Sequence, residues 1–511
     1  MKKTSQTGLS LFNHLFCLSK QSLIYGLGEV ASQLIGFFLL PLYTRYLTPS
    51  DYGILEIFQI TTSVLSIAIV MGISTALFMS YFNYENQQKR KTVVSTALIF
   101  LTLISLSIIL MLVILASNFS IFFFGTPQYT IYFQVIFLTL FFDIAIVIPL
   151  AIFRAREESK KYVIISLLRL LISVGLNIYF IVVLKKGVFG ILEGGLITAS
   201  FLYVLLIPGL FKEIRFRFSK YDLKEMLKFG LPLVPANLAS WILNASNRYF
   251  LLFLTTPFEL GLYSMGNNFG LIVRVLIVGP FTIAWAPFYW SVEKEKNAKE
   301  IFSSVLTYFF LVGMFITLGI SILSKDILVI MTTPPFYGAY KVVPLIALSY
   351  VLYGCYFIVC IGLNLRKKTK FQPLIIGIAA IINLGLNFVL IPNYGMMGAA
   401  IATFISYLTL PIGAYLISRR YYPIEYEWGR LSKIFFVAVV IYGGCFYITD
   451  KSTIISGLSK AIIILIAYPA LLFAVKFFTS EEIQKGKVLI KSAPGYIKQR
   501  LTKIKMIILK R

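Results

Sequence analysis

Charged residues are scarce in this chain, and their scarcity limits what the protein can be. Only 13% of its 511 residues are charged, whereas 58% are hydrophobic and the mean hydropathy is +0.85. A soluble protein carries roughly 25% charged residues, so the chain has too little polar surface for a water-soluble globule. Apolar runs of about 20 residues, long enough to cross a hydrocarbon core of about 30 Å, recur throughout. The sequence therefore predicts an all-α polytopic membrane protein.

Histidine and cysteine are also rare. There is one histidine, and the four cysteines (Cys17, Cys355, Cys360 and Cys445) lie in or beside apolar segments without the spacing of metal ligands. Such residues are typical of free thiols in packed helices. We predict no metal and no cofactor other than a coupling ion.

The apolar runs divide into about fourteen membrane spans. We place them at 22–44, 54–80, 93–116, 131–153, 163–184, 190–211, 229–254, 260–288, 302–322, 341–364, 373–392, 397–417, 433–449 and 457–478. With the N-terminus in the cytoplasm, 37 of the 47 Lys and Arg residues lie in or beside cytoplasmic segments, and external loops hold seven. Basic residues collect on the cytoplasmic side of membrane proteins. This bias predicts that both termini are cytoplasmic, and it explains the net charge of +26 without a nucleic-acid partner.

A short polar turn occurs twice. TPSDYGI at 48–54 returns as TPFELGL at 256–262, which is 208 residues later, and Gly187-Val-Phe-Gly190 returns as Gly395-Met-Met-Gly398. These pairs indicate that the first six spans are duplicated. An even number of spans gives both copies the same direction, which predicts two six-helix lobes related by a pseudo-twofold axis along the membrane normal. We assign 1–211 to the N-lobe, 212–228 to a cytoplasmic linker, 229–420 to the C-lobe, 421–480 to two extra helices and 481–511 to a basic cytoplasmic tail.

Polar side chains form stripes on the spans around the expected lobe interface. An ionisable group at the centre of a membrane helix costs about 2.5–3.5 kcal/mol on insertion scales and usually faces a cavity or a partner. The stripes contain Glu29, Gln33, Glu56, Gln59 and Ser66 in the N-lobe, and Asn237, Asn244, Arg248, Asn267 and Arg274 in the C-lobe. Hydrogen bonding between helices is the alternative role for the amides and hydroxyls. Asp143 and Arg169 in spans four and five form either a structural ion pair or a functional one.

Two segments carry a family resemblance: SLIYGLGEVASQLIGFFLLPLYTRYLTPSDYGIL at 22–55, and RYFLLFLTTPFELGLYSMG at 248–266 followed by AWAPF at 284–288. They resemble the polysaccharide-transporter family, the Wzx-type O-antigen and capsule repeat-unit flippases. Its superfamily also contains multidrug-and-toxin extrusion antiporters and the lipid II flippase. Family members often have Asp-Arg where this chain has Asn247-Arg248. This departure removes the adjacent acid that would partner the arginine and argues against ion coupling at that position.

The resemblance implies translocation of an undecaprenyl-diphosphate-linked oligosaccharide to the periplasmic leaflet of the bacterial inner membrane by alternating access, alongside other polysaccharide-assembly proteins. Sugar hydroxyls need hydrogen-bond partners away from water, and arginine binds diphosphates through charge-assisted bonds. We therefore expect Arg274 and Arg248 to bind the diphosphate and Arg45 to assist its release. Gln33, Gln59, Ser66, Asn237, Asn244 and Asn267 would line the cavity. Glu29, Glu56 or Asp143 would couple H⁺ or Na⁺; the alternative role for Glu29 or Glu56 is to neutralise a neighbouring arginine.

Two other functions compete with this hypothesis. A cation-coupled multidrug antiporter would share the fold, but an arginine at mid-depth disfavours cationic substrates. A polysaccharide polymerase or glycosyltransferase would need catalytic groups in a sizeable external loop. The external loops have about 17 residues at most and contain no paired carboxylates or nucleophile–base arrangement, so we predict that the protein is not an enzyme.

Overall fold

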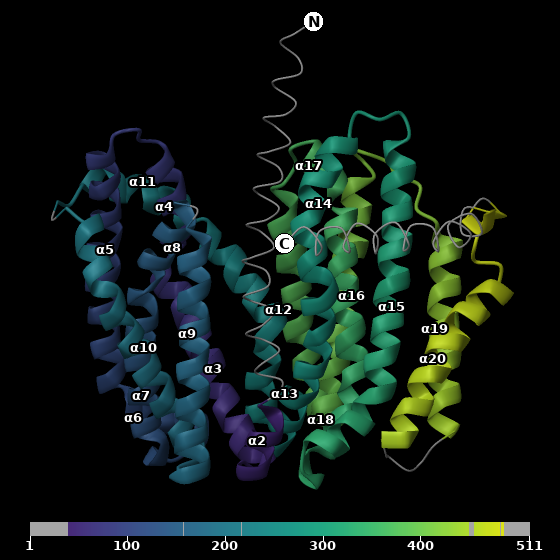
Figure 1. Ribbon diagram of the computed structural model, residues 1–511, viewed down its shortest axis with the longest axis horizontal. Helices are drawn as coiled ribbons and strands as arrows, with labels where there is room; N and C mark the ends of the chain where they lie inside the picture. Colours follow the sequence, from purple (N-terminus) through teal and green to yellow (C-terminus); the bar gives the residue numbers. More distant parts are fainter. Residues whose placement is uncertain (1–38, 157, 216, 449–453, 481, 485–511) are drawn as a thin grey trace, which may run out of the picture.

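The computed structural model describes residues 39–156, 158–215, 217–448, 454–480 and 482–484 (Figure 1). All regular elements among these residues are helical. Eleven helical segments are long and apolar enough to cross a membrane, or twelve if the bent pair Lys220–Gly230 and Leu233–Leu254 forms one span. One of the eleven, α18 (Phe371–Ser418), contains a non-helical residue at Gly395 and covers two predicted spans. The predicted all-α polytopic fold is confirmed, whereas most of the first predicted span, with Glu29 and Gln33, lies outside the described residues.

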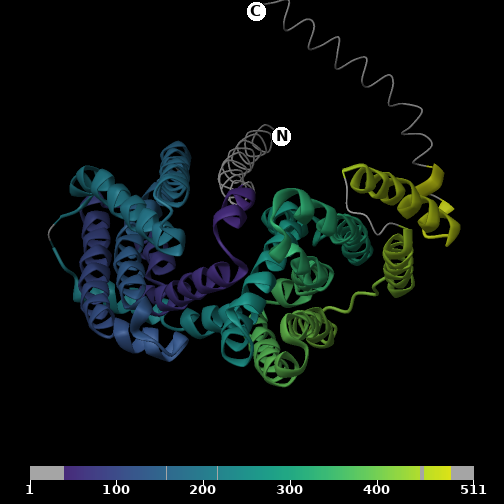
Figure 2. The ribbon, with the colours of Figure 1, turned by 90° about the horizontal axis from the view of Figure 1, so that it is seen from below.

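The helices form two lobes that lie side by side in Figures 1 and 2. The N-lobe contains α2 (Leu40–Tyr46), α3 (Pro49–Val70), α4 (Ile73–Phe82), α5 (Gln87–Ile114), α6 (Ala116–Phe124), η1 (Pro127–Tyr129), α7 (Thr130–Ala145), α8 (Val147–Ala155), α9 (Ser159–Ile178), η2 (Tyr179–Val183) and α10 (Gly187–Glu213). The C-lobe contains α12 (Leu233–Leu254), α13 (Pro257–Val273), η3 (Arg274–Val278), α14 (Gly279–Val292), α15 (Ala298–Met331), η4 (Pro334–Val342), α16 (Val343–Val359), α17 (Ile361–Leu365) and α18. The last two helices, α19 (Trp428–Ile448) and α20 (Ile454–Ala474), pack against α15 at the outer side of the C-lobe.

The duplicated turns are equivalent helix starts. Thr48 and Thr256 are the N-caps of α3 and α13, and each side-chain oxygen accepts a hydrogen bond from the backbone N–H three residues later. A proline follows each threonine in the first helical turn, where its missing N–H costs nothing. Gly187 and Gly395 are likewise equivalent, with φ of 58° and 53°, in the left-handed region that glycine tolerates best. The repeated motifs therefore encode the same local backbone in both lobes.

Helix α3 joins the two lobes because its two faces enter different cores. Leu55 and Phe58 pack with α5 and α7 of the N-lobe, whereas Ile57 and Ile60 belong to the large apolar core of the C-lobe. The second face packs along α12 and α13. The lobes therefore meet along α3, in the half of the bundle predicted to face outside (lower half of Figure 1).

The linker helix α11 (Lys220–Gly230) packs on the N-lobe, against α4 and α5. Asp222 accepts a hydrogen bond of 2.9 Å from the Tyr84 hydroxyl, which raises the pKa of that tyrosine. A Cβ on Gly230 would lie 2.4 Å from the carbonyl oxygen of Met71, so only glycine allows this approach. The chain then bends by 41° between α11 and α12. The bend at 231–232 thus separates the docked linker from the C-lobe.

Candidate functional site

The centre of the lobe interface holds an ion pair between Glu56 of α3 and Arg248 of α12. The Arg248 Nε donates to the Glu56 carboxylate at 2.5 Å, and the side chains of Arg248 and Glu56 are only 8% and 15% exposed, respectively. A charge buried in this way is costly unless a partner compensates it. The carboxylate of one lobe therefore neutralises the guanidinium of the other.

This pairing changes our expectation about position 247. Because Asn247 stands where family members often have aspartate, no acid precedes Arg248 in the sequence. Glu56 supplies an acid from the opposite lobe. Asn247 instead donates to the Tyr263 hydroxyl and to the Thr403 hydroxyl. Sequence spacing within α12 does not reveal which residue of α3 faces Arg248, so the structure was needed to identify Glu56 as its partner.

A hydrogen-bonded network continues from this pair into the C-lobe. Arg248 Nη1 donates to the Asn244 carbonyl oxygen at 2.7 Å, and the side-chain oxygen of Asn244 accepts from the Tyr407 hydroxyl at 2.5 Å. The Arg248 guanidinium also lies 5.9 Å from the centre of the Tyr263 ring. These contacts fix the orientation of the Arg248 side chain, which interacts with Glu56, Asn244 and the Tyr263 ring at the same time.

Arg274 has a different environment. It is the first residue of the π-helical turn η3, and its side chain is exposed. Its guanidinium and the Asn267 amide both interact with the hydroxyl of Tyr350, a buried side chain of α16. None of the ion pairs among the described residues includes Arg274. Arg274 therefore presents a positive charge that no described acid neutralises.

The other predicted site residues lie in several environments. Gln59 and Asn237 are exposed, Ser66 and Asn244 are half-buried, and Asn267 is buried. Arg45 is exposed in the last turn of α2. Asp143 pairs with Arg169 at 2.6 Å between α7 and α9 of the N-lobe. The structure thus joins Glu56, Asn244 and Arg248 in one network and gives Asn267 and Arg274 a shared contact.

Sequence reasoning missed the tyrosines of this region, which are Tyr263, Tyr350, Tyr353 and Tyr407. Tyrosine is abundant in this chain, with 31 residues, so its presence in an apolar span carries little signal. It also missed α18, where Thr403 and Asn383 accept bonds from α12. The presence of Thr403 and Asn383 within apolar segments could have drawn attention to α18. No three or more His, Cys, Asp or Glu side chains cluster as metal ligands in the described ranges.

Two lobes of membrane-length helices, with an ion pair between them, make up the fold of this chain. Solved structures share it: a lipid II flippase MurJ in an inward-closed conformation has a TM-score of 0.72 at 16% identity, covering 88% of this chain and 98% of that chain. An inward-facing multidrug-resistance MATE transporter of the MOP superfamily has a TM-score of 0.60 at 14% identity, covering 79% and 95%.

Residues 42–334 match the family model described as polysaccharide biosynthesis protein, and the chain belongs to that family. Lsg locus protein 1 of Haemophilus influenzae is 26% identical over 284 residues, which are 54% of this chain and 67% of that protein. An uncharacterized membrane protein of the same organism is 23% identical over 290 residues, covering 55% and 67%. The resemblance found in the sequence is therefore confirmed at the level of family and fold.

Proposed function

We propose that this protein is a flippase that moves undecaprenyl-diphosphate-linked oligosaccharide repeat units from the cytoplasmic to the periplasmic leaflet of the bacterial inner membrane. The proposal takes its substrate class from the polysaccharide biosynthesis family and its mechanism from the two-lobed fold. One observation carries it: Arg274 is exposed and has no acidic partner among the described residues, although arginine within a span is costly. Such a group is suited to an anionic substrate.

Comparison with the other arginines within spans sharpens this assignment. Arg169 and Arg248 are each neutralised by a carboxylate, at 2.6 and 2.5 Å. We therefore assign the first diphosphate contact to Arg274, with Asn267 and Tyr350 beside it. Arg248 would join when Glu56 releases it, and Arg45, at the end predicted to be external, would assist release.

The contacts between the lobes support an inward-facing starting state. Besides the Glu56–Arg248 pair, Asn268 donates to Tyr52 at 2.8 Å and the Thr61 and Tyr249 hydroxyls lie 2.9 Å apart. These contacts close the half predicted to be external. Outward movement of two negative charges is favoured by about 4–5 kcal/mol per 100 mV when the cytoplasm is negative. A proton on Glu56 would neutralise that carboxylate and weaken its hold on Arg248, which would couple transport to H⁺.

The test in cells is replacement of Arg274 in a strain whose surface polysaccharide depends on this protein. Arg274→Gln should abolish surface polysaccharide and accumulate the lipid-linked repeat unit, whereas Arg274→Lys should retain part of the activity. Arg154→Gln is a matched control because Arg154 is exposed at the end of α8. Normal surface polysaccharide with Arg274→Gln at normal protein level would reject the assignment. Loss of drug resistance on deletion of the protein, with intact surface polysaccharide, would instead indicate a multidrug antiporter.

A further inference from the structure

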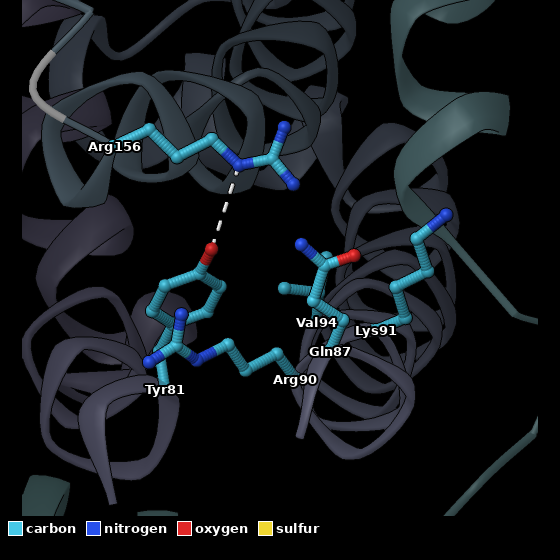
Figure 3. A pocket seen from close by; sticks show the side chains of 6 residues that line it. All are labelled: Tyr81, Gln87, Arg90, Lys91, Val94 and Arg156. Carbon is cyan, nitrogen blue, oxygen red and sulfur yellow. Dashed lines mark hydrogen bonds between the residues drawn. The ribbon is translucent and has the colours of Figure 1, made fainter. Parts of the chain in front are cut away.

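The N-lobe has a pocket of about 420 Å³ at the end that is predicted to face the cytoplasm (Figure 3). The cations that line it already have partners. The Arg156 Nε donates to the Tyr81 hydroxyl at 3.4 Å, which is the dashed line in Figure 3. The Arg90 Nε donates to the Tyr84 carbonyl oxygen at 2.6 Å, and Lys91 also interacts within the chain. These cations therefore serve the fold of the N-lobe.

A pocket of about 500 Å³ in the C-lobe is different. It lies where α18 ends and α19 begins, at the end of the bundle that is also predicted to be cytoplasmic. Its lining includes Tyr415, Arg419, Arg420, Glu425, Tyr426 and Trp428. Tyr426 is buried in the large C-lobe core, and the Ser303 hydroxyl of α15 donates to the Glu425 carbonyl oxygen at 2.7 Å. The connection between α18 and α19 is thus fixed to the C-lobe and forms a defined wall.

The charged side chains of this pocket are not committed to partners. Arg419, Arg420 and Glu425 are exposed, and none of the ion pairs among the described residues includes them. The Arg419 guanidinium lies 5.7 Å from the centre of the Tyr415 ring, and this contact with the ring leaves its N–H groups to other acceptors. Two cations and one carboxylate therefore line the same pocket without neutralising one another.

This set of charges matches a zwitterionic ligand. Arginine binds phosphate oxygens through charge-assisted hydrogen bonds. The Glu425 carboxylate can accept hydrogen bonds from an ammonium group, and aromatic rings such as the three of this lining attract cations. A phosphate joined to a primary ammonium group would satisfy both kinds of charge. A purely anionic ligand would be repelled by Glu425, and a trimethylammonium group has no N–H to donate to it.

The surroundings of the pocket indicate that this ligand is a lipid. Leu416 and Ile412, one and two turns before Arg420 on α18, are 46% and 48% exposed. Side chains four residues apart share one face of a helix, so an apolar strip leads from the membrane to the pocket. Trp428 is 54% exposed and its ring centre lies 5.3 Å from that of Tyr415. Tryptophan and tyrosine are enriched at the level of lipid headgroups.

We propose that this pocket binds the headgroup of phosphatidylethanolamine in the cytoplasmic leaflet. Arg419 and Arg420 hold the phosphate oxygens, Glu425 accepts hydrogen bonds from the ammonium group, and an acyl chain lies along Leu416 and Ile412. The lipid bridges the end of α18 and the start of α19, and so stabilises the attachment of the extra helices at the membrane surface. The inference does not rest on the proposed flippase function, because none of these residues is assigned to the transported substrate.

The experiment is lipid titration of the purified full-length chain in neutral detergent, with bound lipid counted by native mass spectrometry. The probes are phosphatidylethanolamine, phosphatidylglycerol and phosphatidylcholine with identical acyl chains, and phosphatidylethanolamine should bind most tightly. Glu425→Gln should weaken phosphatidylethanolamine binding about two- to fivefold, which is the effect of a partly exposed ion pair. The same variant should bind phosphatidylglycerol as well as or better than the wild type, because the carboxylate no longer repels the anion.

The arginines are tested through the phosphate that all three lipids share. Arg419→Gln/Arg420→Gln should weaken binding of each lipid by more than about tenfold, because hydrogen bonds to a charged group are lost. If that pair does not fold, Arg420→Gln alone should still weaken phosphatidylethanolamine binding about tenfold.

Matched controls come from charged residues of the same end of the C-lobe that do not line the pocket. Arg366 and Lys368 contact the rings of Tyr422 and Tyr421 instead, and Glu300 is exposed in the first turn of α15. Arg366→Gln/Lys368→Gln and Glu300→Gln should leave lipid binding unchanged.

Four results would overturn the proposal. They are equal binding of the three lipids, tighter binding of phosphatidylglycerol than of phosphatidylethanolamine by the wild type, an equal loss of all three lipids in Glu425→Gln, and full binding by the arginine variants. Displacement of the lipid by 10 mM phosphoethanolamine would also overturn it, because it would identify the ligand as a soluble compound.

Discussion

Gly53 of α3 and Gly261 of α13 are equivalent residues of the two repeats, and they lie against each other where the lobes cross. A Cβ on Gly261 would lie 1.8 Å from the Pro49 carbonyl oxygen, and one on Gly53 would lie 2.2 Å from the Pro257 carbonyl oxygen. Each glycine therefore admits the backbone of the other repeat. Close approach of helix backbones at small residues is a common way to pack membrane helices. The pseudo-twofold relation between the lobes is thus built into their contact.

The first prediction concerns this crossing. Gly261→Ala should force α3 and α13 apart, because backbone atoms cannot move away from the new methyl group as a flexible side chain would. Overpacking costs about 1–3 kcal/mol, which should shift the chain toward an outward-accessible state. The measurement uses Gln59→Cys in a background without the native cysteines. This cysteine should react faster with a membrane-impermeant maleimide added outside when Gly261→Ala is present than when Gly261 is kept.

Gly319→Ala is the control for that experiment, because a Cβ on Gly319 would meet no atom within 4 Å. It should leave the labelling rate unchanged. An unchanged rate in Gly261→Ala as well would show that this crossing does not close the external side.

The second prediction concerns the Glu56–Arg248 pair. Glu56→Gln leaves a buried guanidinium without its counter-charge, and breaking a buried pair from one side costs about 3–5 kcal/mol. Glu56→Gln/Arg248→Gln should be more stable than the sum of the single variants predicts. Thermal unfolding in detergent of the wild type, Glu56→Gln, Arg248→Gln and the double variant measures the coupling energy between the two side chains.

Lys186 and Glu193 form the comparison pair, because their side chains are 36% and 30% exposed. Their coupling should be no more than about 1 kcal/mol. Additive effects of the Glu56 and Arg248 variants would mean that the pair does not stabilise the closed interface.

The third prediction concerns the extra helices. Asp326 of α15 and Lys460 of α20 form an ion pair of 2.9 Å, and their side chains are 2% and 7% exposed. Lys460→Met should lower the melting temperature strongly, whereas Asp326→Asn/Lys460→Met should restore most of it because no charge is left unpaired. A single variant with wild-type stability would argue against a fixed attachment of α20 to the C-lobe.

The fourth prediction is a pH dependence at Glu482, which follows α20 in the chain. Burial opposes ionisation of Glu482, but hydrogen bonds from Tyr308, the Thr479 backbone and Arg430 outweigh it and hold the pKa of Glu482 below its ordinary value. A depressed carboxyl pKa stabilises the folded contact above the unfolded value of about 4.3, and this contribution is lost as the pH falls through the folded pKa. The contact should therefore persist at neutral pH and weaken only in acid, as the pH falls through the depressed pKa of Glu482.

Spin labels at Ser304 and Ile483 measure this contact as a distance distribution. The distribution should broaden in acid and, in Glu482→Gln, already be broad at pH 7. A distribution that stays narrow at both pH values in the variant would exclude Glu482 as the attachment.

The sequence predicted those features that depend on local chemistry. The two Thr-Pro turns have the same backbone structure in both lobes, and so do Gly187 and Gly395. Such features are predictable because helix caps and left-handed glycines are determined by a few adjacent residues. The polar stripes also identified Glu56 and Arg248, since an ionisable residue in an apolar run stands out without any structure. The lobe boundaries themselves stay predictions.

Features that depend on the rotation and register of one helix against another were not predictable from one sequence. The spacing of α12 gives the face that carries Arg248 but not the α3 residue opposite it, so the sequence did not assign Glu56 to Arg248. The docking of α11 on the N-lobe depends on contacts more than 100 residues apart, such as Tyr84 with Asp222. The π-helical turn that starts at Arg274 has no sequence signature that we recognised.

The most direct test of the central claim is transport in proteoliposomes. The assay would measure how fast a fluorescent polyprenyl-diphosphate oligosaccharide becomes accessible to a quencher outside, with and without an imposed potential. Hydrogen bonds to charged groups contribute about 1.5–3 kcal/mol, so Arg274→Gln should slow transport at subsaturating substrate by about 10- to 100-fold, with Arg274→Lys intermediate and a negative interior accelerating the wild type. Wild-type rates in Arg274→Gln would contradict an uncompensated arginine as the group that receives the diphosphate.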